Sequence, residues 1–154
     1  MLYFAYGSNM ECVQMKGRCP STSFVGIAKL PNYRLAFTRH STGRGCGVAD
    51  AVPEKGHRVW GVVFKIAESD IDRLDKCEGY QPGREWNSYW RRECKVFLDG
   101  DEGQPVCAQT YFAEREENPP LPKKAYMELI LSGARFWQLP PDYIAELEAI
   151  KVSE

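Results

Sequence analysis

The sequence predicts an α+β domain in which a strongly bent sheet or a small barrel carries helices on its outside. Three observations support this fold class: segments with strand character outnumber helical ones, the helices gather late in the chain, and strands and helices do not alternate regularly. A length of 154 residues fits one domain, 1–154, and is enough to bury a core without disulfides or metal.

The N-terminal part of the chain favours strands interrupted by one short helix. Leu2–Ala5 is an apolar run typical of a buried strand. A short helix is expected over about 10–16, ending at Gly17. Residues 23–38 predict two strands separated by a kink at Pro31.

The middle of the chain predicts two further strands and a helix. Residues 39–47 are polar and rich in glycine, so a loop is expected there. Strands are expected near 48–52 and over 57–66, and the second is apolar on both faces, as in a central strand. A helix is expected over 69–77, with Ser69 as its N-cap.

The C-terminal half predicts a β-hairpin followed by two helices. Residues 88–98 and 105–113 have strand character, and the Asp- and Gly-rich segment 99–103 between them is a strong turn signal. Helices are expected over 125–136 and from about 141 to 150, the last with a proline in its first turn.

Composition excludes several classes of function. A formal net charge of -1 provides no basic footprint, so no nucleic-acid partner is expected. No apolar run approaches the roughly 20 residues that span a bilayer, and the N-terminus does not resemble a signal peptide, so we expect a cytoplasmic protein without a membrane partner. The six cysteines form no C-x-x-C pair, so we expect reduced thiols and no metal site.

The segment Tyr6–Asn9 is the first candidate site because it joins a predicted buried strand to a predicted helix. Such a junction directs free backbone N–H groups and the positive end of a helix at one spot, which suits an anion. Gly7 would let a ligand approach the backbone closely. The alternative is an ordinary helix start capped by Ser8 or Asn9.

Glu78 is the second candidate because it falls on the same helical face as the apolar Ile71 and Leu74. Burial and the C-terminal end of a helix both raise the pKa of a carboxyl group, which suits a general base near neutral pH. The alternatives are a pair with a buried arginine, or an exposed glutamate where the helix frays. No Ser or Cys stands in a nucleophile elbow.

Tyrosine hydroxyls form a third group. Any one of them could position a polar ligand, although a single tyrosine is more often a core residue with its hydroxyl at the surface. The candidates are Tyr6, Tyr80, Tyr89 and Tyr126.

Four motifs in the right order together resemble the γ-glutamylcyclotransferase superfamily. They are Leu2 to Met10 (LYFAYGSNM), Val59 to Val63 (VWGVV), Leu74-Asp75 followed by Glu78-Gly79, and Ser132-Gly133-Ala134 with Tyr126 upstream. The resemblance runs from residue 2 to about 148, nearly the whole chain.

The resemblance implies a small mixed β-barrel with flanking helices and a reaction without a cofactor. That reaction cleaves a γ-glutamyl amide to 5-oxoproline and a free amino acid or amine. By resemblance, Glu78 is the catalytic acid/base. The residues implied to bind the small γ-glutamyl substrate are Tyr6, Gly7, Ser8, Asn9, Tyr89 and Tyr126.

Two alternatives stay open at this point. The enzyme could act on γ-glutamylamines rather than γ-glutamyl amino acids, and positive charge at the outer pocket would favour the amino acids; Arg39, Arg44 and Arg84 are loop candidates for it. The chain could also be a non-catalytic member of the fold that binds a small molecule. A monomer and a homodimer are both compatible with the sequence.

Overall fold

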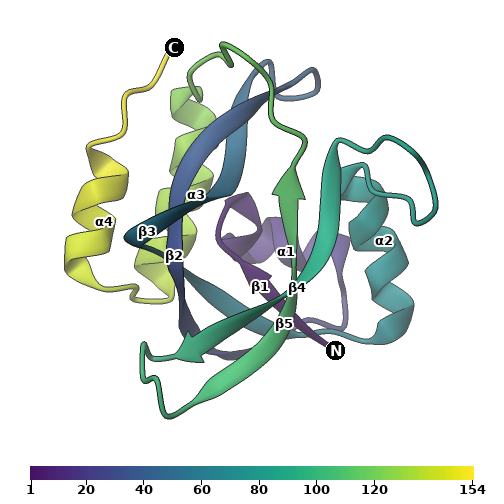
Figure 1. Ribbon diagram of the computed structural model, residues 1–154, viewed down its shortest axis with the longest axis vertical. Helices are drawn as coiled ribbons and strands as arrows, with labels where there is room; N and C mark the ends of the chain where they lie inside the picture. The colour runs from purple at the N-terminus through teal and green to yellow at the C-terminus, as the bar shows by residue number, and fades with distance from the viewer.

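Five strands close into a barrel in the order β1-β3-β2-β4-β5 (Figure 1). The computed structural model describes all 154 residues. β1 pairs in parallel with β5 to close the barrel, and the other pairs are antiparallel, so the barrel is mixed as expected. The strands are β1 (Leu2–Ala5), β2 (Ser23–Ser41), β3 (Cys46–Lys65), β4 (Tyr89–Leu98) and β5 (Pro105–Ala113).

β2 and β3 are two long paired strands, whereas the sequence predicted four shorter ones. The expected kink is present, because the register shifts between Pro31 and Tyr33 and Asn32 has a φ of 63°. A bulge of this kind bends a strand without ending its pairing. The predicted loop 39–47 was also too long: β2 continues to Ser41 and β3 begins at Cys46, so only the hairpin tip 42–45 remains.

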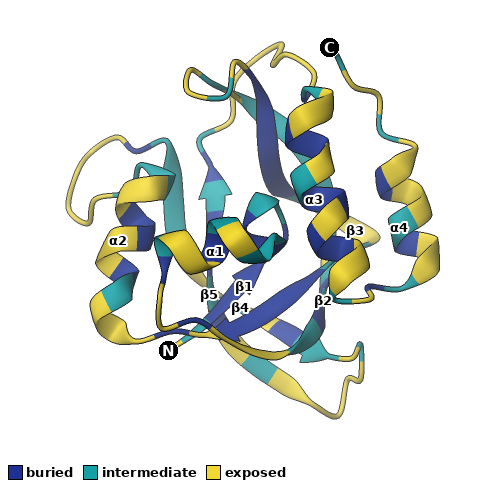
Figure 2. Cartoon of the chain, turned by 180° about the vertical axis from the view of Figure 1, so that it is seen from behind, coloured by how far each residue is buried: buried dark blue, intermediate teal, exposed yellow.

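Four helices flank the barrel. α2 lies on one side, and α3 and α4 lie on the other (Figure 1). Each helix has an exposed face that points outward and a buried face that is turned toward the rest of the molecule (Figure 2). No helix is both long and apolar enough to cross a membrane. The bounds are α1 (Cys12–Arg18), α2 (Glu68–Glu78), α3 (Lys124–Phe136) and α4 (Pro141–Glu148).

The starts of α1 and α2 differ from the sequence predictions. A short 3-10 turn, Ser8–Met10, separates β1 from α1. Glu11 caps α1 instead of Ser8 or Asn9, because its carboxylate accepts hydrogen bonds of 3.1 and 2.7 Å from two N–H groups of the first turn. The predicted Ser69 cap was wrong as well: α2 begins one residue earlier, after Ala67, and no side chain caps it.

Close packing against α3 fixes the position of the 3-10 turn. A Cβ atom on Gly133 would lie 2.5 Å from the Cβ of Met10, so only glycine allows this approach. The indole Nε1 of Trp137, just after α3, donates to the Met10 carbonyl at 2.9 Å. Met10 itself is fully buried in the hydrophobic core. The turn after β1 is therefore held from behind by a helix that is distant in sequence.

Candidate active site

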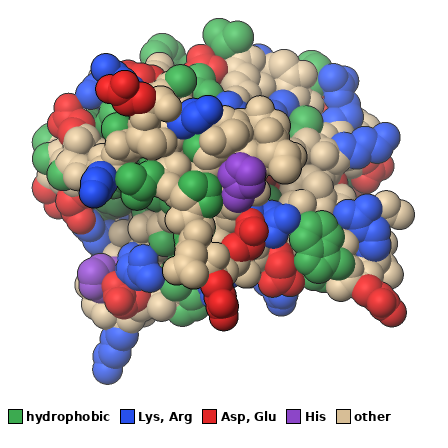
Figure 3. Space-filling view, turned by 90° about the horizontal axis from the view of Figure 1, so that it is seen from above, with side chains coloured by type: hydrophobic (Ala, Val, Ile, Leu, Met, Phe, Trp, Pro, Cys, Tyr) green, Lys and Arg blue, Asp and Glu red, His purple; other side chains and the backbone are tan.

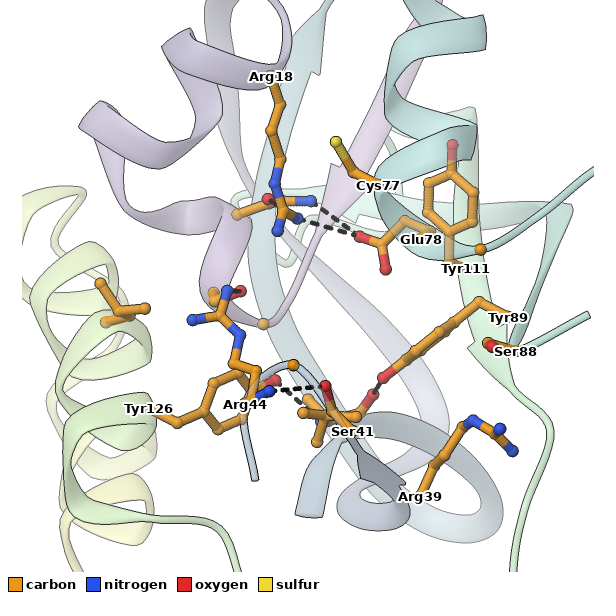
Figure 4. Close-up of a pocket in the computed structure, with 18 of the residues that line it drawn as sticks. Arg18, Arg39, Ser41, Arg44, Cys77, Glu78, Ser88, Tyr89, Tyr111 and Tyr126 are labelled. Atoms are coloured by element: carbon orange, nitrogen blue, oxygen red, sulfur yellow. Dashed lines mark hydrogen bonds and ion pairs between the residues drawn. The ribbon is translucent and has the colours of Figure 1, made fainter. Parts of the chain in front are cut away.

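A cavity of about 780 Å³ opens where the turn after β1, the end of α2, β4, the β2–β3 hairpin tip and the start of α3 meet. Figure 4 shows the side chains converging on it from these elements. Every residue that the family resemblance implied for catalysis or substrate binding lines this cavity, whereas the candidates Tyr80 and Arg84 do not. The implied residues are Tyr6, Gly7, Ser8, Asn9, Glu78, Tyr89 and Tyr126.

Glu78 is the last residue of α2, and helix periodicity brings it to the cavity. Ile71 and Leu74 are buried on the same face of the helix, as predicted. Gly79 ends the helix with a φ of 70°, in the left-handed region that suits glycine. The Glu78 side chain is only 17% exposed, which excludes the freely solvated glutamate considered above.

Two polar side chains contact the Glu78 carboxylate at the same oxygen. The Nδ2 of Asn9 donates to Oε1 at 3.1 Å, and the Nη1 of Arg18 lies 3.7 Å from it. Burial raises the pKa of the Glu78 carboxyl, and the opposing effects of Arg18 and the Asn9 hydrogen bond only partly offset this. Glu78 is thus loosely paired with an arginine, which was one of the alternatives for this residue. Its raised pKa still suits it to accept and return a proton.

The Asn9 amide is the centre of a hydrogen-bond network. Its Nδ2 also donates to the Tyr3 hydroxyl at 2.9 Å, and its Oδ1 accepts from Gln14 and Arg18, both at 3.0 Å. Gln14 and Arg18 are four residues apart, so one face of α1 presents both to Asn9. This network orients the amide group toward Glu78.

The backbone of the turn after β1 offers donors to the cavity. The N–H groups of Gly7, Ser8 and Asn9 make no hydrogen bond within the protein, although all three residues line the cavity. The next two N–H groups, of Met10 and Glu11, are bonded to carbonyls of the same turn. Because Glu11 caps α1, the available donors belong to this turn and not to the helix end that the sequence suggested.

Tyr89 and Tyr126 form another wall of the cavity and share one backbone partner, Ala49. The Tyr89 hydroxyl donates to the Ala49 carbonyl at 2.6 Å. The Tyr126 hydroxyl accepts from the Ala49 N–H at 3.0 Å, so its own proton stays available. Tyr126 can therefore donate a hydrogen bond to a ligand, whereas the proton of Tyr89 is already used.

Behind Glu78, a second buried carboxylate fixes α2 to the barrel. Asp75 accepts from the Tyr111 hydroxyl at 2.6 Å and from the Arg91 Nε at 3.0 Å. Asp75 is itself buried. Tyr80, one of the tyrosines singled out in the sequence, is not a cavity residue and packs against Trp90.

No site role was predicted from the sequence for Arg18, Gln14, Asp75 and Tyr111, and Arg44 was predicted only as a loop residue that could bring positive charge to the pocket. The four-residue spacing of Gln14 and Arg18 was the one local signal available. The contacts of the others are between elements far apart in the chain. No group of three or more His, Cys, Asp or Glu side chains is placed to hold a metal ion, and all six thiols are unpaired.

Comparison with known proteins identifies the family. The family model described as "Gamma-glutamyl cyclotransferase, AIG2-like" matches residues 3–129. The human gamma-glutamylcyclotransferase is 34% identical over 158 residues, covering 99% of this chain and 80% of that protein, and the mouse protein is 34% identical over 157 residues with the same coverage. A solved structure titled "Gamma-glutamyl cyclotransferase" superimposes with a TM-score of 0.89 at 31% identity, covering 100% of this chain and 89% of that one. On this evidence, the chain belongs to the gamma-glutamyl cyclotransferase, AIG2-like family.

Proposed function

We propose that the protein is a γ-glutamylcyclotransferase that converts γ-glutamyl amides to 5-oxoproline and a free amino acid or amine. One observation carries the mechanism: the largely buried Glu78 carboxyl, whose pKa is raised by burial, lines the same cavity as the free N–H groups of Gly7, Ser8 and Asn9. A substrate with a carboxylate next to an amine would use both features. Membership of the family supports the same reaction.

Binding begins with the α-carboxylate of the glutamyl group. In this proposal it accepts hydrogen bonds from the backbone of Gly7, Ser8 and Asn9, whose N–H groups have no acceptor in the protein. Hydrogen bonds to an ionised acceptor are stronger than neutral ones. Fixing the carboxylate there would aim the neighbouring α-amine at Glu78, since both features line one cavity.

Glu78 then acts as the general base and the general acid. The carboxylate removes a proton from the α-ammonium, and the resulting amine nitrogen attacks the side-chain carbonyl carbon of the same glutamyl group. Because the attack is intramolecular, most of its entropic cost is met when the bent substrate binds. Glu78 gives its proton to the leaving nitrogen as the tetrahedral intermediate collapses and the amide C–N bond breaks. The ring nitrogen still carries one surplus proton, which the Glu78 carboxylate removes and passes to the released amine, so no water is consumed.

The tyrosines beside the cavity are the candidates for stabilising the carbonyl oxygen of the substrate. Negative charge develops on this oxygen during attack, and a fixed donor nearby lowers the barrier. The Tyr126 hydroxyl keeps its proton available, because its hydrogen bond with the Ala49 N–H uses it as the acceptor. The Tyr89 hydroxyl already donates its proton to the Ala49 carbonyl, so Tyr89 would instead hold the wall of the cavity in place.

The decisive test is 5-oxoproline release by the wild type and by Glu78→Gln from γ-glutamyl-alanine, γ-glutamyl-ε-lysine, glutathione and a γ-glutamyl alkylamine. We expect Glu78→Gln to keep the fold and substrate binding but to lose turnover. Glu68→Gln, an exposed residue at the other end of α2, is the matched control and should retain wild-type release. Near wild-type turnover by Glu78→Gln would refute the mechanism.

The same panel separates the remaining possibilities. Release from the alkylamine alone would indicate a γ-glutamylamine cyclotransferase. Thermal stabilisation by these compounds without any product would instead indicate a binding protein. We also propose a cytoplasmic location, which the six unpaired thiols support because such thiols persist in reducing compartments.

A further inference from the structure

Arg18 and Glu78 carry opposite charges and face the same cavity. On the face of the protein seen in Figure 3, lysine and arginine side chains are interspersed with aspartate and glutamate, and pairs of exposed charges contribute little because water screens them. The side chains of Arg18 and Glu78 are only 24% and 17% exposed, and both line the cavity, where Glu78 is the one acidic residue. A cation this close to the proposed acid/base residue acts on its carboxyl group with little screening.

The end of α1 that carries Arg18 is held in place on both sides. The next residue, Cys19, is fully buried, and its Sγ donates to the carbonyl of Asp70 in α2 at 3.7 Å. The Lys16 Nζ donates to the Thr22 carbonyl at 2.7 Å, which ties the last turn of α1 to the segment that follows it. The Arg18 guanidinium is therefore presented to the cavity from a fixed backbone.

Arg18 sets the direction of the hydrogen bonds that reach Glu78. The side-chain amides of Asn9 and Gln14 each contain a donor and an acceptor, so neither amide alone fixes which way it points. Arginine carries only donors, and the Arg18 Nη1 donates to the Asn9 Oδ1 at 3.0 Å. The Asn9 oxygen must therefore face Arg18, which leaves the Asn9 Nδ2 to donate to the Glu78 Oε1 at 3.1 Å.

The two oxygens of the Glu78 carboxyl consequently differ. Oε1 accepts from Asn9 and lies 3.7 Å from the Arg18 Nη1. The fully buried side-chain polar atoms without a partner belong to Thr22 and Tyr143, so Oε2 of Glu78, which has no partner either, is reached from the cavity. In Figure 4 both dashed contacts end on one oxygen, and the other is turned away from Arg18. This second oxygen is the one that a substrate proton can reach.

These contacts give Arg18 a role beyond pairing. We propose that Arg18 is a positioning residue for the reaction: through Asn9 and Oε1 it holds the Glu78 carboxyl with Oε2 facing the substrate ammonium group. Its charge has a second effect. Burial raises the pKa of Glu78, and the charge of Arg18 is the largest influence that lowers it, which keeps more of the carboxyl ionised and ready to accept a proton. Because the reaction is itself the proposed function, this role rests on that proposal and deepens it.

Other groups around Glu78 also bear on its titration. The charge of Arg44 lowers the pKa of Glu78 and that of Asp75 raises it, but both remain in place when Arg18 is replaced. Burial raises the pKa of the five tyrosine hydroxyls near Glu78, so they stay neutral; these belong to Tyr3, Tyr6, Tyr89, Tyr111 and Tyr126.

The cavity lining contains five further charged or titratable residues. They are Arg39, His40, Lys76, Cys77 and Lys123. Of these residue types, only histidine ordinarily titrates below neutral pH, where the acid limb of an activity profile lies. A His40→Gln variant is therefore included in the test, to separate its titration from that of Glu78.

Arg18→Gln removes the charge but keeps a polar side chain. In the pH profile of kcat/KM for 5-oxoproline release, we expect the acid limb to move up by about one pH unit or more, the effect of losing an opposite charge close to a carboxyl group. At neutral pH, kcat should fall by about tenfold or more, because the proton acceptor is no longer held in line. KM should change much less, since the donors proposed for the α-carboxylate are backbone N–H groups of the turn after β1.

Two arginine variants and the histidine variant complete the set. Arg18→Lys keeps the charge but not the planar group, so its acid limb should stay near that of the wild type while its kcat lies between those of the wild type and Arg18→Gln. Arg34→Gln is the matched control, because Arg34 is also paired with a glutamate, Glu54, at 3.4 Å, but lies outside the cavity. Arg34→Gln and His40→Gln should both keep the wild-type acid limb.

An acid limb that stays in place in Arg18→Gln would overturn the inference. So would a raised KM with unchanged kcat, which would make Arg18 a direct substrate ligand. Carbon-13 NMR of labelled glutamate carboxyls follows the same titration without substrate, with Glu78→Gln identifying the Glu78 signal; its midpoint should be higher in Arg18→Gln, and an equal midpoint would also count against the inference. Failure of the proposed function is recognised separately, because the wild type would then release no 5-oxoproline from any substrate, even with the midpoint shifted.

Discussion

The side chains of Asn9 and Glu78 are 69 residues apart in sequence and are joined by a hydrogen bond of 3.1 Å. Both N–H protons of the Asn9 amide and both lone-pair directions of its oxygen have partners. An amide with this full set of partners cannot turn over without losing several of them. The 3-10 turn after β1 and the end of α2 therefore present their functional groups in one fixed arrangement.

Asn9→Ala should move the acid limb of the pH profile. The Asn9 hydrogen bond favours the ionised carboxyl and lowers the pKa of Glu78, against the larger effect of burial. Its removal should raise that pKa further, so kcat/KM for 5-oxoproline release should begin to fall at a higher pH than in the wild type. A profile with an unmoved acid limb would show that Asn9 does not influence the proton acceptor. Asn118→Ala, in an exposed loop, is the control.

Glu78→Gln should stabilise the protein near neutral pH. The pKa of Glu78 is higher in the folded protein than in the unfolded chain, so the folded state binds more protons between the two values. The free energy of unfolding of the wild type then falls as pH rises through that window. Glutamine has no such titration. In urea unfolding, we expect the stability advantage of the variant to grow from low pH to neutral pH, and a constant difference would argue against the raised pKa.

Tyr126→Phe and Tyr89→Phe form a matched pair of variants. Each removes one hydrogen bond to the backbone of Ala49, so each should lower the free energy of unfolding by about 1 kcal/mol. Of these two residues, Tyr126 alone keeps its hydroxyl proton available to the substrate, so Tyr126→Phe should lower kcat about tenfold or more, and Tyr89→Phe should lower it much less. Equal losses of kcat would remove the case for Tyr126 as the donor.

Gly133→Ala should destabilise the protein by roughly 1–3 kcal/mol, as overpacking does in a well-packed core. The added methyl group would meet Met10 at 2.5 Å and push the 3-10 turn away from α3. Activity should fall too, because that turn carries Asn9 and the free N–H groups. Denaturant unfolding and 5-oxoproline release measure the two effects.

Gly17→Ala is the control for that experiment. Gly17 also lies in a helix, α1, but a methyl group there would have no heavy atom within 4 Å. Alanine is favoured over glycine in helices by about 1 kcal/mol, so this variant should be at least as stable as the wild type. If Gly17→Ala and Gly133→Ala behave alike, close packing at Met10 is not the cause.

Local patterns in the sequence were enough to predict most elements and the position of Glu78. The apolar run Leu2–Ala5, the glycine after α2 and the turn 99–103 each act within a few residues, where backbone geometry and hydrophobic periodicity decide the structure. Predicted boundaries were wrong where longer-range pairing prevailed. β2 and β3 continue across Pro31 because their antiparallel partners hold them together on both sides of the bulge.

Residues close along the chain were enough to predict the α+β class, the inward face of α2 and the candidate turn Tyr6–Asn9, because each depends on local patterns. Which groups meet at the cavity depends instead on how distant segments pack together. The contacts of Glu78 with Asn9 and Arg18, and those of Arg44 with Gln14, join segments that no local pattern relates. Closing the barrel and docking α3 on the 3-10 turn bring these segments together, and burial in that arrangement is what raises the pKa of Glu78.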